Sequence, residues 1–146
     1  MAPVLEQVLE KYPHDVKVVF KNFPLRNHRF AMKAAIAALA AQSQGKFWEF
    51  HDLLYQNYKQ LSDQKIQEIA QEVGLNLEEF EKKINDPATA RQVGQDLLEG
   101  QEIGVRGTPT VYINGIRLKN RSLYGFEEAI DRQLEKLGKT TVKPAS

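Results

Sequence analysis

The 146-residue sequence contains no cysteine. Without a thiol, these residues can form no disulfide, ligate no zinc through thiolates and supply no sulfur nucleophile. The sequence also lacks an excess of charge of one sign. Its formal net charge is +1, which argues against nucleic acid or an anionic membrane as a partner held by a bulk electrostatic field. No apolar run approaches the roughly 20 residues of a membrane-spanning helix.

Histidine is scarce as well, and the spacing of the few histidines excludes familiar metal motifs. His14, His28 and His51 do not stand four residues apart, and no carboxylate completes a known ligand pattern. The serines lack the context of a nucleophile elbow, and the glycines form no phosphate-binding loop. We therefore predict no metal site and no cofactor, and we expect His51 to pack against neighbouring helical residues.

Apolar residues recur at helical spacing along most of the sequence. Ser62 and Asn76 have the side chains and the following sequence of helix N-caps, and Asp86 precedes a proline that suits a first helical turn. Helices are predicted over 3–11, 31–41 and 47–58, from Ser62 to Gly74, from Asn76, from Asp86 to about Gly104, and over 126–137. The aromatic residues of 47–58 are interpreted as a core stripe, with a hydrophobic substrate groove as the alternative.

The stretch 107–115, Gly-Thr-Pro-Thr-Val-Tyr-Ile-Asn-Gly, carries the most information. Thr108 and Pro109 lead into a β-branched and aromatic strand at 110–113. Asn114 and Gly115 predict a type I′ turn, because both accept a positive φ, and a second strand follows at 116–119. A further strand is predicted at Val16–Phe20. The order is therefore helix, strand, several helices, hairpin, helix, which is an α/β arrangement.

Three segments, taken together, resemble the DsbA family of bacterial thiol–disulfide oxidoreductases. They are 18–26 (VVFKNFPLR), 45–53 (GKFWEFHDL) and 105–115 (VRGTPTVYING). The resemblance extends from about Pro3 to Leu137. It implies an α/β thioredoxin-like fold in a single domain over 1–146, with a helical insertion at about 29–104 and a polar tail at 139–146.

The resemblance also implies a substrate-binding site at Arg106, Gly107, Thr108 and Pro109. Pro109 is expected in the cis form, and the backbone beside it is expected to pair with an extended or unfolded peptide by β-addition. Arg106 and Gly107 are expected to shape the loop. From the residues alone, the alternative is a trans proline that opens a strand.

Two features of the family are missing from these residues. Family members begin with a strand, and a Cys-x-x-Cys motif follows at the start of the first helix; we expect both upstream of Met1. No catalytic residue is therefore present. The missing strand is central in the sheet, so its absence leaves three alternatives. The two neighbouring strands close up on each other, another chain donates a strand as a partner or as a swapped homodimer, or the protein is only marginally stable.

These expectations favour a truncated member of the thiol–disulfide oxidoreductases, which catalyse protein disulfide formation or exchange. The 146-residue chain itself is expected to be redox-inactive, because it contains no cysteine. One alternative is a cysteine-free peptide-binding or chaperone-like module. Another is a glutathione-binding relative similar to kappa-class glutathione transferases. The resemblance implies the periplasm or cell envelope, although residues 1–11 lack the basic start and apolar stretch of an export signal.

Overall fold

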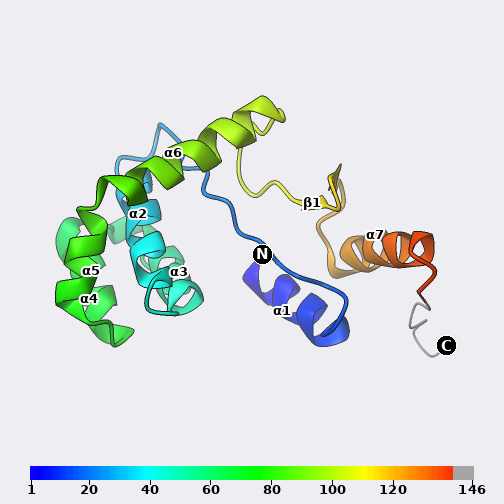
Figure 1. Ribbon diagram of the computed structural model, residues 1–146, viewed down its shortest axis with the longest axis horizontal. Helices are drawn as coiled ribbons and strands as arrows, with labels where there is room; N and C mark the ends of the chain where they lie inside the picture. Colours follow the sequence, from blue (N-terminus) through cyan, green and yellow to red (C-terminus); the bar gives the residue numbers. More distant parts are fainter. Residues whose placement is uncertain (140–146) are drawn as a thin grey trace. The chain divides into compact units, whose positions relative to one another are not determined.

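Figure 1 shows the protein as a computed structural model, in which residues 1–139 are described. The polar tail predicted at 139–146 lies, except for Lys139, outside the described residues. The chain divides into two compact units: residues 20–107 form one, and residues 1–19 together with the chain from Thr108 onward form the other. Each unit is described by itself.

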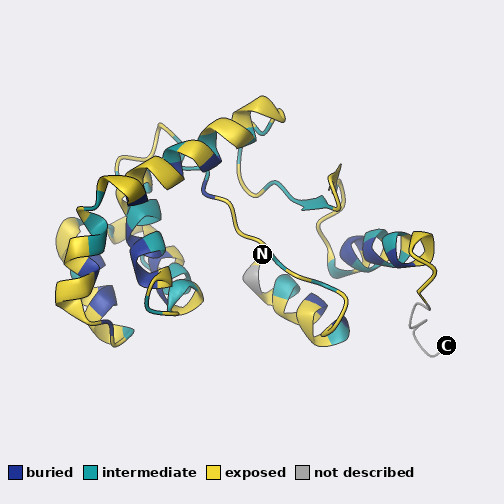
Figure 2. Ribbon diagram, viewed as in Figure 1, coloured by how far each residue is buried: buried dark blue, intermediate teal, exposed yellow. Residues whose placement is uncertain are grey.

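Residues 20–107 form a helical unit around an alanine-rich helix. Its helices are α2 (Ala31–Gln42), α3 (Phe47–Gln56), α4 (Asp63–Glu72), α5 (Leu77–Ile84) and α6 (Pro87–Glu102). The helix α2 contacts each of the others. Its small side chains let the neighbouring helices approach closely, and the core consists of Ala37, Ala38, Ala40, Ala41, Phe50, Leu54, Ile66, Ile69, Ala70, Leu75 and Phe80. Figure 2 shows this buried surface on α2.

Three helices of this unit begin at side chains that accept a backbone N–H. The Ser62 hydroxyl accepts from Lys65 at 3.0 Å, the Asn76 carbonyl oxygen from Glu79 at 3.0 Å, and the Asp86 carboxylate from Ala88 at 2.9 Å. Each bond satisfies a donor that has no partner within its helix. The predicted starts of α4, α5 and α6 are confirmed.

The aromatic helix is shorter than predicted. It ends at Gln56, and Tyr58 begins a single 3₁₀ turn, Tyr58–Gln60, in which Tyr58 is 61% exposed. Phe50 and Leu54 are buried, so the core interpretation is confirmed for them and wrong for Tyr58. The helical ladder ends at its C-cap, Asn57, whose backbone N–H and side-chain amide both donate to the Leu53 carbonyl, at 3.1 and 2.8 Å.

The other unit packs two helices and a hairpin around one apolar cluster. It contains α1 (Ala2–Lys11), β1 (Tyr112–Ile113), β2 (Ile116–Arg117) and α7 (Leu123–Lys136). The helices α1 and α7 contact each other. The buried cluster consists of Val8, Tyr12, Phe126, Ile130 and Leu134. Leu137, predicted as part of the apolar face, lies beyond α7 and is 68% exposed.

The strand predicted at Val16–Phe20 is wrong. These residues form no regular structure, and Val19 is 64% exposed. A strand persists only where its backbone groups pair with a neighbour, and within residues 1–139 the only sheet is the pair β1–β2. The Val16 amide instead donates to the Tyr12 carbonyl, at 3.2 Å, just after α1. Alternating apolar sequence alone did not make a strand.

Candidate functional site

The hairpin that follows the Thr-Pro pair has a tight turn and a single register. The strands are antiparallel, with Tyr112 opposite Arg117 and Ile113 opposite Ile116. Asn114 has a φ of 47° and Gly115 a φ of 80°, which confirms the predicted turn with two positive φ angles. Regular strand geometry is shorter than the predicted 110–113 and 116–119, because only two residues on each side keep it.

The loop before β1 is exposed and is tied to the far end of the hairpin. The Thr108–Pro109 peptide bond is cis. Both residues are exposed. The Arg121 guanidinium donates from Nη1 to the carbonyl oxygen of Pro109. One side chain therefore fixes the loop against the segment that leads into α7.

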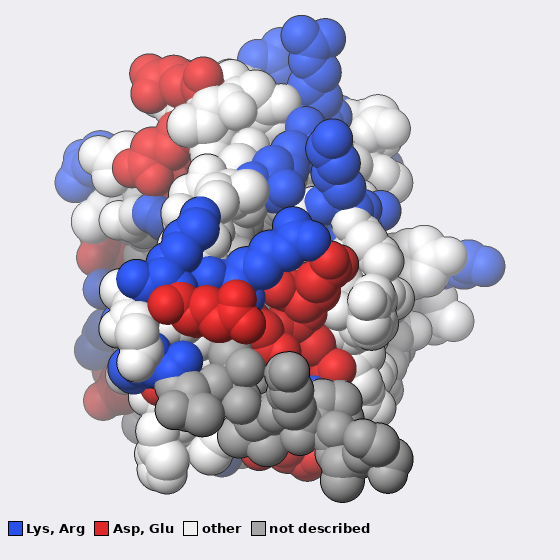
Figure 3. Space-filling model, turned by 90° about the vertical axis from the view of Figure 1, so that its right-hand side faces the viewer, with Lys and Arg blue, Asp and Glu red and all other residues white. Residues whose placement is uncertain are grey.

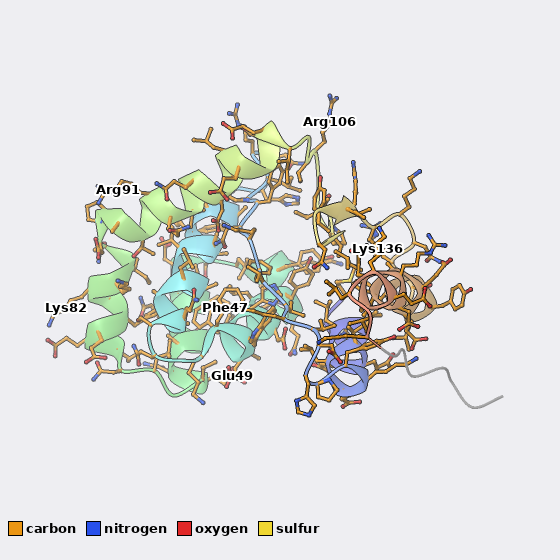
Figure 4. All side chains as sticks on the ribbon, turned by 45° about the vertical axis from the view of Figure 1, so that its right-hand side comes forward. Phe47, Glu49, Lys82, Arg91, Arg106 and Lys136 are labelled. Carbon is orange, nitrogen blue, oxygen red and sulfur yellow. The ribbon has the colours of Figure 1, made fainter. Side chains whose placement is uncertain are left out.

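The four predicted site residues follow one another in sequence but belong to two units. Arg106, which is exposed, and Gly107 end the 20–107 unit; Thr108 and Pro109 resume the other. Figure 4 labels Arg106 after α6. The candidate site is therefore built on Thr108, Pro109 and the hairpin that follows them.

Sequence reasoning missed Arg121 as a site residue. The predicted turn at Asn114–Gly115 already contained the signal, because it places Ile113 opposite Ile116. Each step away from the turn then moves one residue back on the first strand and one residue forward on the second. Five such steps bring Thr108 opposite Arg121. The hydrogen bond from Arg121 to the Pro109 carbonyl agrees with this count. Arg121 is thus the side chain that the predicted hairpin brings to the predicted loop.

His51 lies in an aromatic cluster of the 20–107 unit. Its ring centroid is 5.1 Å from that of Phe20, 5.7 Å from Phe47 and 5.4 Å from Tyr55. Its Nδ1 is 3.2 Å from an Asp52 carboxylate oxygen. The predicted packing role of His51 is confirmed. Within residues 1–139, no group of three or more His, Asp or Glu side chains is placed to hold a metal ion.

The buried carboxylate of Asp96 has a positioning role in the same unit. It accepts the Asn22 backbone N–H at 3.0 Å, the Asn22 side-chain amide at 2.8 Å and the Gln92 amide at 3.1 Å. Burial raises the pKa of Asp96, but these hydrogen bonds and the Lys21 ammonium outweigh it, so the pKa lies below its ordinary value. The carboxylate fixes the segment before α2 on α6.

Comparison with known proteins identifies the family. The sequence model of a family described as thioredoxin matches residues 1–132. The chain belongs to the thioredoxin family. Two solved structures resemble this thioredoxin-family chain: a thioredoxin-like oxidoreductase from Silicibacter pomeroyi (TM-score 0.72, 26% identity, 91% of this chain and 78% of that one), and the thiol-disulfide exchange protein alpha-DsbA2 from Wolbachia pipientis (TM-score 0.75, 22% identity, 90% and 72%). The fold is thioredoxin-like and mostly helical, with a small two-stranded sheet.

Two curated relatives show how much of a longer protein this thioredoxin-family chain can match. A probable disulfide bond formation protein D from Bacillus cereus is 32% identical over 143 residues, which cover 91% of this chain and 66% of that protein. A Na(+)/H(+) antiporter, NhaA 3, from Salinispora tropica is 35% identical over 116 residues, which cover 79% of this chain but only 18% of the antiporter. Among residues 1–139, no helix has the length and apolar character needed to span a membrane.

Proposed function

We propose that this chain is the peptide-holding part of a DsbA-like thiol–disulfide oxidoreductase. The observation that carries the proposal is the exposed Thr108–Pro109 loop, which leads directly into β1 and whose carbonyl is held by Arg121. An exposed backbone beside a strand can pair with an extended peptide by adding it to the hairpin. Membership of the thioredoxin family and the likeness to oxidoreductases support this use of the loop.

The chemical step requires sulfur that residues 1–146 do not contain. In thiol–disulfide exchange, a thiolate attacks one sulfur of a disulfide; a mixed disulfide forms, and the other sulfur leaves as a thiolate. A second thiolate then attacks the mixed disulfide and releases the first partner. This chain has no cysteine, so both attacking thiols come from outside these residues. The proposed role of the chain itself is to bind and orient the peptide.

The redox part of the proposal is tested by insulin reduction with the purified 146-residue chain. We expect insulin to precipitate at the rate set by dithiothreitol alone, because the chain offers no thiolate. A dithiol oxidoreductase with a Cys-x-x-Cys motif is the positive control. A rate that rises in proportion to the concentration of this chain would contradict the proposal.

The peptide-binding part is tested with two variants of one residue. Thr108→Ala removes the side chain but keeps the backbone N–H, whereas Thr108→Pro removes the N–H that β-addition uses. By fluorescence anisotropy with a labelled, uncharged, extended peptide, we expect the Ala variant to bind like the parent chain and the Pro variant to bind at least tenfold more weakly. Equal binding by both variants, or no binding by the parent chain, would refute the role of the loop.

Three further parts of the proposal rest on the resemblance. They are a periplasmic or cell-envelope location, a strand-donating partner or swapped homodimer, and a single domain in which about 29–104 is an insertion. The insertion is supported by the division of the chain into two units, since residues 20–107 form one continuous unit between the two parts of the other unit.

Light scattering tests the homodimer, whose mass is twice 16.7 kDa. Retention on immobilised glutathione would favour the glutathione-binding alternative instead.

A further inference from the structure

The hairpin has one face that packs on the core. Val111, Ile113 and Leu118 lie against the cluster that includes Val8 and Phe126. The Leu118 N–H donates to the Val111 carbonyl at 2.8 Å, so the pairing continues one step beyond the regular strands. Because neighbouring strand residues point to opposite faces, the residues between these apolar ones are directed away from the core.

Three cations lie in β2 and in the segment just after it. Arg117 faces Tyr112 in the register, and Lys119 and Arg121 follow in the segment that leads into α7. All three basic residues are exposed. We call Arg117, Lys119 and Arg121 the cationic face. It lies beside the candidate loop, because Arg121 contacts the Pro109 carbonyl.

Within residues 1–139, no ion pair joins the cationic face to an acidic side chain. The sequence contains no Asp or Glu between Glu102 and Glu127. Among residues 1–139, Arg117 and Lys119 have no carboxylate partner, whereas most lysines elsewhere do, as in the pairs Lys11–Glu127, Lys33–Asp63, Lys82–Glu78 and Lys139–Asp15. Figure 3 shows Lys and Arg side chains on the face that it presents, with Asp and Glu side chains beside some of them. The cationic face therefore has charge available for a partner.

We propose that the cationic face selects acidic peptides, that is, extended segments with carboxylates at alternate positions. The inference rests on the proposed function, because it concerns the peptide that the Thr108–Pro109 loop would hold. Arg117, Lys119 and Arg121 stand at alternate positions of the sequence, and an extended peptide presents alternate side chains, roughly 6.6 Å apart, on one side. Arg121 keeps further N–H groups for a carboxylate after its bond to Pro109, because a guanidinium carries five. The net charge of +1 disfavours a polyanion such as nucleic acid.

The test compares two labelled peptides of equal length and extended pattern. One carries Glu at three alternate positions, and the other carries Gln at the same positions. By fluorescence anisotropy in 50 mM salt, we expect the Glu peptide to bind the full chain about fivefold or more tightly than the Gln peptide, in line with a few exposed ion pairs. In 500 mM salt the difference shrinks, because the charges are screened.

Matched variants locate the selectivity. Arg117→Gln with Lys119→Gln removes two of the three charges of the cationic face, and we expect most of the preference for the Glu peptide to be lost, with the affinity for the Gln peptide unchanged. The control is Lys59→Gln with Arg91→Gln, which removes two exposed cations of the 20–107 unit; Figure 4 labels Arg91 on α6. The control variant keeps the preference for the Glu peptide. Circular dichroism confirms that both variants fold.

The outcomes separate this inference from the proposed function. If the parent chain binds the Glu and Gln peptides equally, the selectivity is refuted and peptide binding stands. If it binds neither, both proposals fail. A preference that is undiminished in the Arg117 and Lys119 variant overturns the assignment to the cationic face. Binding to phosphatidylglycerol vesicles that needs Arg117 and Lys119, without discrimination between the peptides, would also overturn it.

Discussion

At the scale of single residues, two helical glycines differ in whether a larger side chain would fit in their place. Gly125 lies in the first turn of α7, and a Cβ built there would stand 2.2 Å from the Asn120 carbonyl oxygen. That atom belongs to the backbone of the segment that carries Lys119 and Arg121. Gly94 lies inside α6, and a Cβ there would meet no atom within 4 Å. Of these two glycines, Gly125 alone is required by close packing.

We predict that Gly125→Ala destabilises the chain and that Gly94→Ala stabilises it. The first substitution forces backbone apart and costs about 1–3 kcal/mol. The second replaces a poor helix former with the best one and contributes up to about 1 kcal/mol. Urea unfolding followed by circular dichroism measures both changes. A Gly125→Ala variant as stable as the parent chain would show that Asn120 can move away without cost.

At the scale of elements, a buried carboxylate joins an irregular segment to a helix. Asp96 on α6 is 5% exposed and binds both the backbone and the side chain of Asn22. Hydrogen bonds to a charged group are stronger than those between neutral groups, and they replace the water that burial removes. The segment before α2 has no regular structure. The Asp96 side chain therefore holds this segment on α6 through hydrogen bonds, where a strand would be held by backbone pairing.

We predict that Asp96→Asn lowers stability at pH 7 by about 1.5–3 kcal/mol and flattens its dependence on acid pH. The pKa of Asp96 in the folded state lies below the ordinary value of 3.8. As the pH falls through 3.8, the unfolded state therefore binds a proton first, and the stabilisation is lost toward the lower folded pKa. Urea midpoints at pH 7, 5, 4 and 3 measure this. The control, Asp63→Asn, removes an exposed partner of Lys33, and we expect a change below about 1 kcal/mol.

At the scale of the whole molecule, two separate apolar clusters stabilise the two units. One lies within residues 20–107, and the other joins α1, near the beginning of the chain, to the hairpin and α7, which come more than a hundred residues later. Phe80 is fully buried in the first cluster, with its ring centroid 5.5 Å from that of Phe50. The fold therefore depends on contacts between residues that are distant in sequence.

We predict that Phe80→Ala costs about 3–5 kcal/mol, because it removes a buried ring and leaves a cavity among α2, α3 and α5. Denaturation by guanidinium chloride, fitted with a common slope, measures the loss. Leu98→Ala is the matched control, because Leu98 on α6 is 59% exposed, and we expect it to change stability by less than about 1 kcal/mol. A loss below 1 kcal/mol for Phe80→Ala would contradict the described core.

The sequence by itself determined the features that depend on neighbouring residues. Helix starts at Ser62, Asn76 and Asp86 and the turn at Asn114–Gly115 require only local hydrogen bonds and local φ preferences, so their residues specify them. The Thr108–Pro109 loop was predicted as part of the site from the family resemblance, because it lies in one of the three segments that carry that resemblance, 105–115.

The tertiary structure decided which residues make contacts with segments distant in sequence. Val16–Phe20 has the composition of a strand but does not form one, because a strand needs hydrogen bonds from a second segment and the described residues supply none. Tyr58 has helical spacing but is exposed, because Asn57 ends the helix first. Arg121 reaches the Pro109 carbonyl only through the hairpin register, which brings residues twelve apart in sequence into contact. Contacts between residues distant in sequence depend on how the whole chain folds, so the tertiary structure added Arg121 to the loop that the sequence had predicted.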